Sequence, residues 1–318
     1  MEADGITLTD LDQIRAVELD AVLEEEVQAW RVELDWDFQP AAEMIRRYVE
    51  RKAILGSALL VDGALAGYAY SVADERKGIV GSLYVRARQR NEERENALLK
   101  QVLENLVRVP RVHRVEAQLM MLGNPFRSGL PGERYLRIHE RNFMMTELEG
   151  VGSLPTGRAG EKIFMLNWTE RRQDDAAQVI VASYQGHVDG QINDQYRSPG
   201  GARRFLMNIV QYPGCGMFHA AASFMAVERE TGKMCGISLA SMVAGEVGHI
   251  TQICVTPAVK GRGVGYELMR RSLAALAASG CRKASLTVTA SNREAVELYE
   301  RMGFTTLRKF AAYVWDGL

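Results

Sequence analysis

Residues 249–273 read HITQICVTPAVKGRGVGYELMRRSL, and they join an apolar strand-like run to a helix-like run through a glycine-rich turn. Three glycines alternate with other residues directly before the helix-like run. Glycines at a helix start let backbone N–H groups approach an anion closely, and the helix dipole favours negative charge there. The turn therefore predicts a pyrophosphate-binding site, with two basic side chains adding positive charge. Its predicted residues are Lys260, Gly261, Arg262, Gly263, Val264 and Gly265.

Two other phosphate-binding motifs have a different spacing. A P-loop places Lys-Ser or Lys-Thr after its last glycine, and no such pair follows Gly265. A dinucleotide-binding fingerprint reads G-x-G-x-x-G and has an acidic residue about 20 residues further on. This chain reads G-x-G-x-G, and Ser279-Gly280-Cys281 occupies the place of the acidic residue. A glycine-rich turn that binds no ligand remains the alternative interpretation.

A second motif follows at residues 292–304, which read NREAVELYERMGF and have the form N-x-x-A-x-x-L-Y-x-x-x-G-F. Together with the upstream V-x-P and K-G-x-G-x-G, in this order and spacing, it strongly resembles the GNAT superfamily of acyl-CoA-dependent N-acyltransferases. The resemblance covers roughly residues 218–315. The chain departs from the family at Lys260, where Arg or Gln is usual. The resemblance implies acetyl-CoA as the acyl donor, and direct transfer in a ternary complex without an acyl-enzyme.

Length and composition are typical of a cytosolic globular protein of about two domains. The chain has 318 residues, of which 47% are hydrophobic, and a formal net charge of −1. This charge argues against a general nucleic-acid or membrane-surface binder, and no run approaches the ~18 apolar residues of a membrane span. The acidic start lacks the basic region of a secretory signal. Four cysteines without C-x-x-C spacing predict reduced thiols, and five scattered histidines predict no metal site.

The two halves of the chain align when the first is shifted by 170 positions, so that Val85 falls on Val255 and Arg90 on Lys260. We therefore expect an internal duplication, with two tandem GNAT-like domains in a layout similar to that of mycothiol synthase-like proteins. An unrelated α/β domain aligned by chance is the alternative. The predicted boundary lies in residues 149–158, which are rich in Gly, Pro and Ser. The predicted domains are residues 1–157 and 158–318.

The two copies differ where the chemistry is expected. In the first copy, Asn91, Glu93 and Glu95 stand in place of the three glycines, and Ile138 stands in place of Tyr299. Side chains there block close backbone approach, and carboxylates repel a phosphate. The first domain is therefore predicted to be a degenerate copy that cannot bind the cofactor. Catalysis is then expected in the second domain.

Periodicity predicts an α/β fold in which a mixed, mostly antiparallel sheet is flanked by helices. In the second half, helices are expected over residues 174–186, 203–210, 264–279 and 291–302. An Asp174-Asp175 pair is expected to cap the first of these, and Ser291 is the expected N-cap of the last. Strands are expected over residues 161–168, 218–227, 234–243, 247–255, 283–289 and 304–314.

The resemblance implies how the cofactor is held beyond the glycine turn. The backbone of Ile253, Cys254 and Val255 would pair with the pantetheine arm in the manner of an added strand. The backbone near Cys254 would polarise the thioester carbonyl. Asn292 would bond the arm further along, and simple capping of its helix is the alternative role for this residue.

Acyl transfer also needs an acid for the departing thiolate and a base for the amine. Tyr299 is the predicted acid, because it shares a helix face with Asn292 and a phenol has a pKa near 10. His249 is the first candidate base, Glu246 the second, and an ordered water chain is a third possibility. An acyl-cysteine at Cys254 is not favoured, since a buried thiol of ordinary pKa is inert.

The acceptor is expected to bind at residues 186–201, a connector that is unusually polar and aromatic. Asp189, Asp194 and Tyr196 could bind a cationic amine there, although a solvated loop explains the same composition. The predicted partner is a small-molecule or peptide amine, and the resemblance makes a cysteinyl pseudo-disaccharide one acceptor to test. A non-catalytic acyl-CoA sensor or assembly module is the alternative function.

Overall fold

The computed structural model describes residues 5–74, 76–123, 129–157, 159, 162–212 and 214–318. The chain forms two compact units, and the first combines Met1–Arg141 with Lys309–Leu318. The second unit is Asn142–Arg308. Among the described residues, no helix combines the length and the apolar character that crossing a membrane requires.

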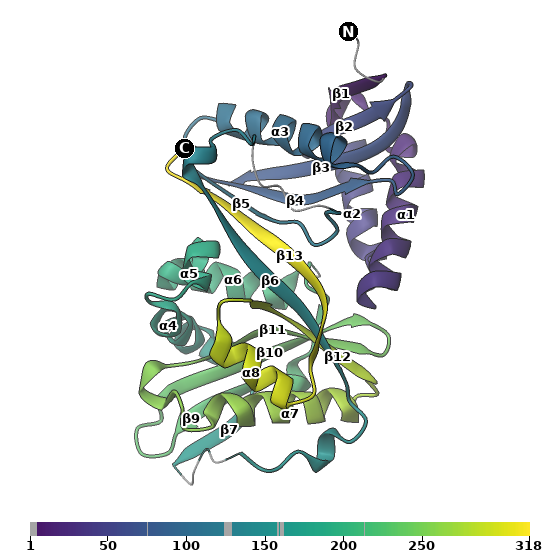
Figure 1. Ribbon diagram of the computed structural model, residues 1–318. Helices are drawn as coiled ribbons and strands as arrows, with labels where there is room; N and C mark the ends of the chain where they lie inside the picture. The colour runs from purple at the N-terminus through teal and green to yellow at the C-terminus, as the bar shows by residue number, and fades with distance from the viewer. Residues whose placement is uncertain (1–4, 75, 124–128, 158, 160–161, 213) are drawn as a thin grey trace. The chain divides into compact units, whose positions relative to one another are not determined.

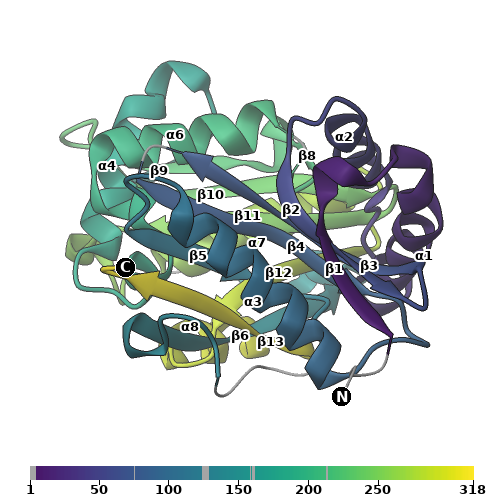
Figure 2. The ribbon, with the colours of Figure 1, turned by 90° about the horizontal axis from the view of Figure 1, so that it is seen from above.

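The first unit is a six-stranded sheet with helices, drawn in purple to teal in Figure 1 except for β13, which is yellow. Its strand order is β1-β2-β3-β4-β5-β13, and only the β4–β5 pair is parallel. Helix α3 lies across the strands (Figure 2), and its leucines pack on the apolar face that Val115 and Trp315 help to form. The elements are β1 (Ile6–Asp10), α1 (Ala16–Leu34), α2 (Gln39–Glu50), β2 (Leu55–Val61), β3 (Ala64–Asp74), β4 (Lys77–Val85), α3 (Glu92–Arg108), β5 (Arg114–Gln118) and the end of β13 (Thr305–Asp316).

The second unit has the strand order β6-β12-β11-β10-β9-β7. Helices α4 and α6 pack on one face of this sheet, against residues such as Ile237 and Leu239. Helix α7 packs on the other face through Leu268 and Leu273. The elements are β6 (Leu136–Glu147), β7 (Ile163–Asn167), α4 (Gln173–Tyr184), α5 (Asp189–Ile192), α6 (Pro199–Gln211), β8 (Met217–Phe218), β9 (Phe224–Glu228), β10 (Met234–Ala244), β11 (Val247–Val255), α7 (Val264–Ala278), β12 (Lys283–Thr289) and α8 (Arg293–Arg301).

Short 3-10 helices connect these elements. They are η1 (Leu11–Gln13), η2 (Glu133–Tyr135), η3 (Val151–Ser153), η4 (Glu170–Arg172), η5 (Asp194–Arg197), η6 (Ala220–Ala222) and η7 (Pro257–Val259).

The internal duplication is confirmed, and both copies have a β-bulge at the equivalent position. Adding 170 to the bounds of β3 and β4 gives the bounds of β10 and β11. The pairing of β3 with β4 skips Gly81, and the pairing of β10 with β11 skips Thr251, which is again 170 positions later. The predicted α/β fold of two tandem copies, each with a mostly antiparallel sheet, is therefore correct.

The compact units do not follow the predicted division at residues 157 and 158. Strand β6 comes from the first half of the sequence and lies beside β12 in the second unit, whereas β13 comes from the second half and pairs with β5. The expected linker also packs on α7, since the Tyr266 hydroxyl donates to Pro155 O at 2.9 Å and Gly157 N–H donates to Glu267 at 2.9 Å. Glycine and proline mark turns, but they do not show whether a turn is packed. Arg158 and Glu161, the latter the expected start of a strand, lie outside the described residues.

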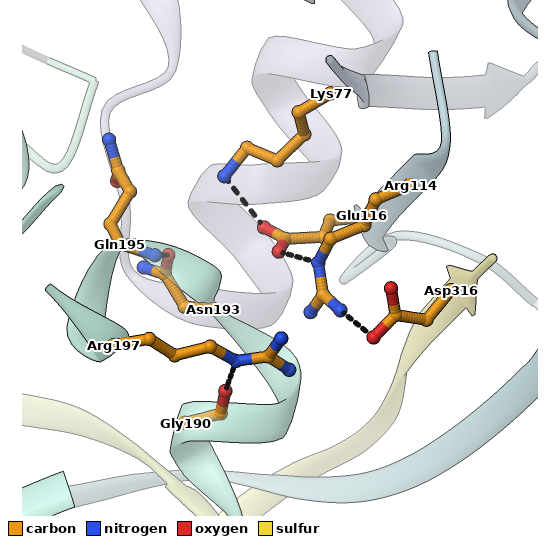
Figure 3. Close-up of polar contacts among 8 residues, drawn as sticks. All are labelled: Lys77, Arg114, Glu116, Gly190, Asn193, Gln195, Arg197 and Asp316. Carbon is orange, nitrogen blue, oxygen red and sulfur yellow. Dashed lines mark hydrogen bonds and ion pairs between the residues drawn. The ribbon is translucent and has the colours of Figure 1, made fainter. Parts of the chain in front are cut away.

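Buried charges join β13 to the rest of the first unit's sheet, as Figure 3 shows. Arg114 is almost completely buried and donates to Glu116 at 2.6 Å and to Asp316 at 2.7 Å. Lys77 of β4 completes the group, with its Nζ 3.2 Å from Glu116. Buried charges need partners in fixed geometry, so the network favours one register of β13 against β5.

Three local predictions were wrong. Asn292, and not Ser291, is the N-cap of α8. Helix α4 begins at Gln173 without a side-chain cap, because the aspartates lie inside its first turn. The expected strand over residues 218–227 is broken by η6. In each case the apolar pattern located the element, and the local hydrogen bonds decided where it began.

Candidate active site

Strands β11 and β12 separate at the bulge. Their parallel pairing ends with Ile250 opposite Leu286, whereas β11 continues to Val255 and β12 to Thr289. The bulge residue Thr251 donates its hydroxyl to Leu239 O at 3.1 Å, and a bulge bends its strand away from its partner. The described register therefore leaves the β12-facing edge of the last residues of β11 without a strand partner. The predicted pantetheine-binding residues Ile253, Cys254 and Val255 lie on this edge.

The glycine turn opens α7 at the end of this separated strand. Gly261 and Gly263 have φ angles of +75° and +78°, a left-handed conformation that strongly favours glycine, and Gly263 is the N-cap of α7. Gly265 lies in the helix without such strain, and a Cβ built there would meet only Val255 Cγ1 at 3.8 Å. Buried Val264 anchors the turn in the apolar core. The turn thus presents backbone N–H groups with open space before the third glycine.

The basic residue of the turn is close to an acidic residue of α8. Lys260 Nζ lies 2.9 Å from the carboxylate of Glu294, and both side chains are largely exposed. The hydrogen bond and charge of Lys260 lower the pKa of Glu294 below its ordinary value. An exposed ion pair contributes little stability, so an incoming phosphate could displace this carboxylate from the lysine.

Tyr299 lies in the same region and is held in its protonated form. Its side chain is buried, and burial raises the pKa of Tyr299 well above that of an ordinary phenol. The nearby charge of Asp189 raises the pKa of Tyr299 further, as does Cys254. Burial also raises the pKa of the Cys254 thiol to about 12, which keeps that sulfur neutral and a poor nucleophile. Tyr299 can therefore serve as a proton donor beside the separated edge of β11.

His249 lies on β11, and Glu246 lies in the turn that precedes this strand. His249 is buried in the paired part of the strand, where Nδ1 lies 2.9 Å from Ser285 Oγ and the ring stacks on Phe143. Burial lowers the pKa of His249 to about 3. Glu246 lies in the turn before β11, nine residues from Val255, which corresponds to roughly 30 Å along a strand. Glu246 therefore lies far along the strand from the glycine turn that follows Val255, and its role as a base stays a prediction.

The acceptor connector supplies polar residues that meet the ends of the strands. Thr289, the last residue of β12, donates its hydroxyl to the carboxylate of Asp189. Tyr184 donates its hydroxyl to Gln252 of β11 at 3.3 Å, and His187 Nδ1 accepts the backbone N–H of Asp189 at 3.2 Å. Of these residues, the sequence pointed only to Asp189. Gln252 and Thr289 occupy ordinary strand positions, so only the tertiary fold shows that they face the connector.

The connector is internally braced rather than a loose solvated loop. Arg197 Nε donates to Gly190 O at 2.7 Å, and the Asn193 side chain accepts the backbone N–H of Gln195 at 3.0 Å (Figure 3). Tyr196 stacks on Tyr184 with ring centroids 4.4 Å apart. These contacts connect the segment that carries His187 and Asp189 to α4 and to itself.

The corresponding region of the first unit is filled by its own side chains. Asn91 caps α3 by accepting the Arg94 N–H at 2.8 Å, and Glu95 accepts the Gly123 N–H at 2.9 Å. Arg90 donates to the carbonyl of Val85 at the end of β4 at 3.1 Å. These three donors are therefore engaged within the unit, and the loss of cofactor binding there stays a prediction.

Part of the chain matches the sequence profile of a known protein family. Residues 161–304 match the sequence profile described as "Acetyltransferase (GNAT) family". The match lies within the second unit, and the chain as a whole shares its fold with solved GNAT structures that include a tandem GNAT protein.

Its curated relatives match over short segments. "N-alpha-acetyltransferase MAK3" of Arabidopsis thaliana is 34% identical over 71 residues, which is 22% of this chain and 37% of the relative. "Mycothiol acetyltransferase" of Streptomyces avermitilis is 37% identical over 86 residues, which is 27% of this chain and 28% of the relative. These matches thus span roughly a third of the length of the relatives.

Two solved structures share the fold over nearly the whole chain. A GCN5-related N-acetyltransferase from Sphaerobacter thermophilus has a TM-score of 0.66 at 16% identity, covering 99% of this chain and 97% of its own. A tandem GNAT protein from the clavulanic acid biosynthesis pathway has a TM-score of 0.62 at 13% identity, covering 98% and 99%. At these identities the likeness establishes the fold alone.

Proposed function

We propose that this chain is an acetyl-CoA-dependent N-acetyltransferase with its active site in the second unit. The observation that carries the proposal is the meeting of three features at one end of β11: a separated strand edge, an anion-binding helix start and a buried protonated tyrosine. The first two suit the extended arm and the pyrophosphate of acetyl-CoA. The buried tyrosine suits the sulfur of the departing CoA thiolate, which must gain a proton.

The proposed chemistry assigns a task to each feature. Bound acetyl-CoA supplies the thioester, and the backbone near Cys254 would polarise its carbonyl as the neutral amine attacks. Collapse of the tetrahedral adduct forms the amide bond and breaks the carbon–sulfur bond. Tyr299 donates its proton to the departing thiolate and regains one from the amide nitrogen. Burial raises the pKa of Tyr299 and so keeps its proton in place at physiological pH, where a thiolate that forms in the same desolvated surroundings could accept it.

The proposed acceptor is a primary amine on a small molecule or a peptide. Two relatives are named for N-alpha acetylation and for mycothiol, so the panel of acceptors should include a cysteinyl pseudo-disaccharide and short peptides with a free α-amine. The rival proposal is an acyl-CoA sensor. A sensor binds acetyl-CoA and releases no thiol with any amine, whereas a transferase releases one thiol per amide formed.

The proposal is tested by calorimetric titration with acetyl-CoA, followed by thiol release with the amine panel. We expect one acetyl-CoA site per chain, and we expect Tyr299→Phe to lower kcat by roughly 10²–10⁴-fold with affinity unchanged. Tyr212, which is 60% exposed, provides the matched control Tyr212→Phe. Binding without thiol release would favour the sensor. No binding at millimolar acetyl-CoA would exclude both functions, and two sites would show that the first unit also binds.

A further inference from the structure

Gln252 carries a buried hydrogen-bond donor that no described residue of the protein engages. The residue lies on β11, directly after the bulge, and is only 6% exposed. The Tyr184 hydroxyl donates to its Oε1 at 3.3 Å, which leaves the Nε2 end of the amide. Nε2 is shielded from solvent and has no hydrogen-bond partner among the described residues. A buried donor without a partner is unfavourable, and a ligand oxygen that accepts its hydrogen bond removes that penalty.

The equivalent donor in the first unit is already engaged. Ser82 follows the bulge of β4 as Gln252 follows the bulge of β11, 170 positions later. The Ser82 hydroxyl donates to Glu26 of α1 at 2.9 Å, and that carboxylate is completely buried. The copy that is predicted to be degenerate therefore satisfies this position with its own side chain. In the second unit no described residue does so, and Gln252 Nε2 is left for an oxygen from outside the chain.

Gln252 faces the part of the site where the amine is expected to bind. Its side chain and that of Cys254 lie on the face of the sheet that α4 and α6 cover, whereas Ile253 packs on the α7 face. Tyr184, whose hydroxyl contacts the amide, stacks on Tyr196 of the connector with ring centroids 4.4 Å apart. One aromatic side chain thus links the amide of Gln252 to the connector.

The spacing along β11 limits how far the bound oxygen can be from the reacting amine. Gln252 and Cys254 are two residues apart and share a face, which corresponds to roughly 7 Å along a strand. The amine must attack a thioester carbonyl beside Cys254, so an oxygen bound by Nε2 belongs to a group within a few bonds of that amine. A carbonyl on the carbon next to the amine meets this condition.

We propose that Gln252 is a specificity residue for the acceptor, and that its Nε2 donates a hydrogen bond to a carbonyl oxygen adjacent to the reacting amine. The acceptors are therefore α-amino amides, in which one carbon carries both the amine and the carbonyl, rather than simple alkylamines. This inference rests on the proposed acetyltransferase function. The Tyr184 hydroxyl acts as a positioning group, because its bond to Oε1 orients the amide.

The experiment measures thiol release by the full-length protein with acetyl-CoA and a matched pair of acceptors. One acceptor is alanyl-alanine amide. The other is its alkene isostere, in which a carbon–carbon double bond replaces the first amide bond and removes the carbonyl oxygen. We expect the parent protein to prefer the amide by roughly tenfold in kcat/KM, and Gln252→Met to remove this preference by slowing the amide alone. Tyr184→Phe should give an intermediate preference, since Oε1 then lacks the bond that orients it.

The design is a cycle between one side chain and one substrate oxygen, so differences in the basicity of the two amines cancel. Gln211→Met, at the exposed end of α6, is the matched control and should keep the parent preference. Thermal unfolding and calorimetric titration with acetyl-CoA show that each variant is folded and binds the cofactor. The cysteinyl pseudo-disaccharide also carries a carbonyl beside its amine, and its rate should respond to Gln252→Met as that of the peptide does.

The outcomes separate this inference from the proposed function. An equal loss with both acceptors in Gln252→Met would indicate a structural role or an ordered water at Nε2, and it would overturn the inference. A parent protein that acetylates the isostere as fast as the amide, or that uses only amines without a neighbouring carbonyl, would overturn the inference and leave the proposed function standing. No thiol release by the parent protein with any amine of the panel would overturn both.

Discussion

His249 and Tyr299 are both buried in the second unit, and burial disfavours the charged form of each side chain. For the histidine, the charged form is the cation, so the pKa of His249 falls to about 3. For the tyrosine, the charged form is the anion, so the pKa of Tyr299 rises. Both groups are therefore neutral at physiological pH. The phenol of Tyr299 therefore keeps its proton, whereas an imidazole of such low pKa is a poor base for an amine.

The low pKa of His249 predicts a pH-dependent stability. An unfolded histidine binds a proton below about pH 6.5, whereas the folded His249 stays neutral until about pH 3. Between these values the unfolded state binds more protons, so the free energy of unfolding should fall as the pH falls from 6.5 toward 3. His249→Gln should flatten this dependence in denaturant titrations at several pH values. An equally steep dependence in His249→Gln would show that other groups cause it.

Helices α3 and α7 are equivalent elements of the two copies, but their first turns differ in side-chain capping. Helix α3 begins with Asn91 as a side-chain cap, and its Glu95 binds the protein's own backbone. Helix α7 begins at Gly263 without a side-chain cap. Since both helices follow a bulged strand, their position in the fold is the same. The side chains of the first turn decide whether the helix start can bind an external anion.

Gly265→Ala tests the helix start without straining it. The new Cβ would meet only Val255 Cγ1 at 3.8 Å, and alanine is favoured over glycine in a helix by about 1 kcal/mol. We expect unchanged or higher stability and acetyl-CoA affinity reduced roughly tenfold or more, because the methyl group occupies space proposed for phosphate. Gly200→Ala is the control, since Gly200 is likewise the second residue of a helix and has open surroundings. Unimpaired binding in Gly265→Ala would place the pyrophosphate elsewhere.

At the scale of the whole molecule, each compact unit includes strand residues from the other half of the sequence. The second unit includes the end of β6, and the first unit includes the end of β13. The second unit is continuous, but it begins at Asn142 inside β6 and includes the segment that packs on α7. The backbone N–H of Leu148 also donates to Arg282 O at 2.7 Å. A domain cut at the Gly-rich segment therefore removes part of the folded unit.

Two fragments that differ only in residues 142–157, the end of β6 and most of the Gly-rich segment, test the point. We expect residues 142–308 to unfold cooperatively and bind acetyl-CoA, since they contain the complete second unit. Residues 158–308 should lose both properties, because the exposed edge of β12 and the uncovered part of α7 are left without partners. Thermal unfolding and calorimetric titration measure the two outcomes. Equal behaviour of the fragments would show that the expected linker is dispensable.

The sequence alone determined the local and repeated features of this protein. Strands at 247–255 and 283–289, the turn that starts α7 and the 170-residue duplication were all predictable, because hydrophobic period, glycine spacing and self-similarity are properties of neighbouring residues. Tyr299 was also predictable as a candidate, because its motif is local. Its assignment as the acid stays a prediction.

Only the tertiary structure decided which distant residues meet. The exchange of β6 and β13, the separation of β11 from β12 and the contact of Thr289 with Asp189 all join segments far apart in the chain. Burial likewise depends on the whole fold, and it lowers the pKa of His249 while His187 remains partly exposed. Local patterns carry no information on such distances, because strand pairing and desolvation are set by packing between elements.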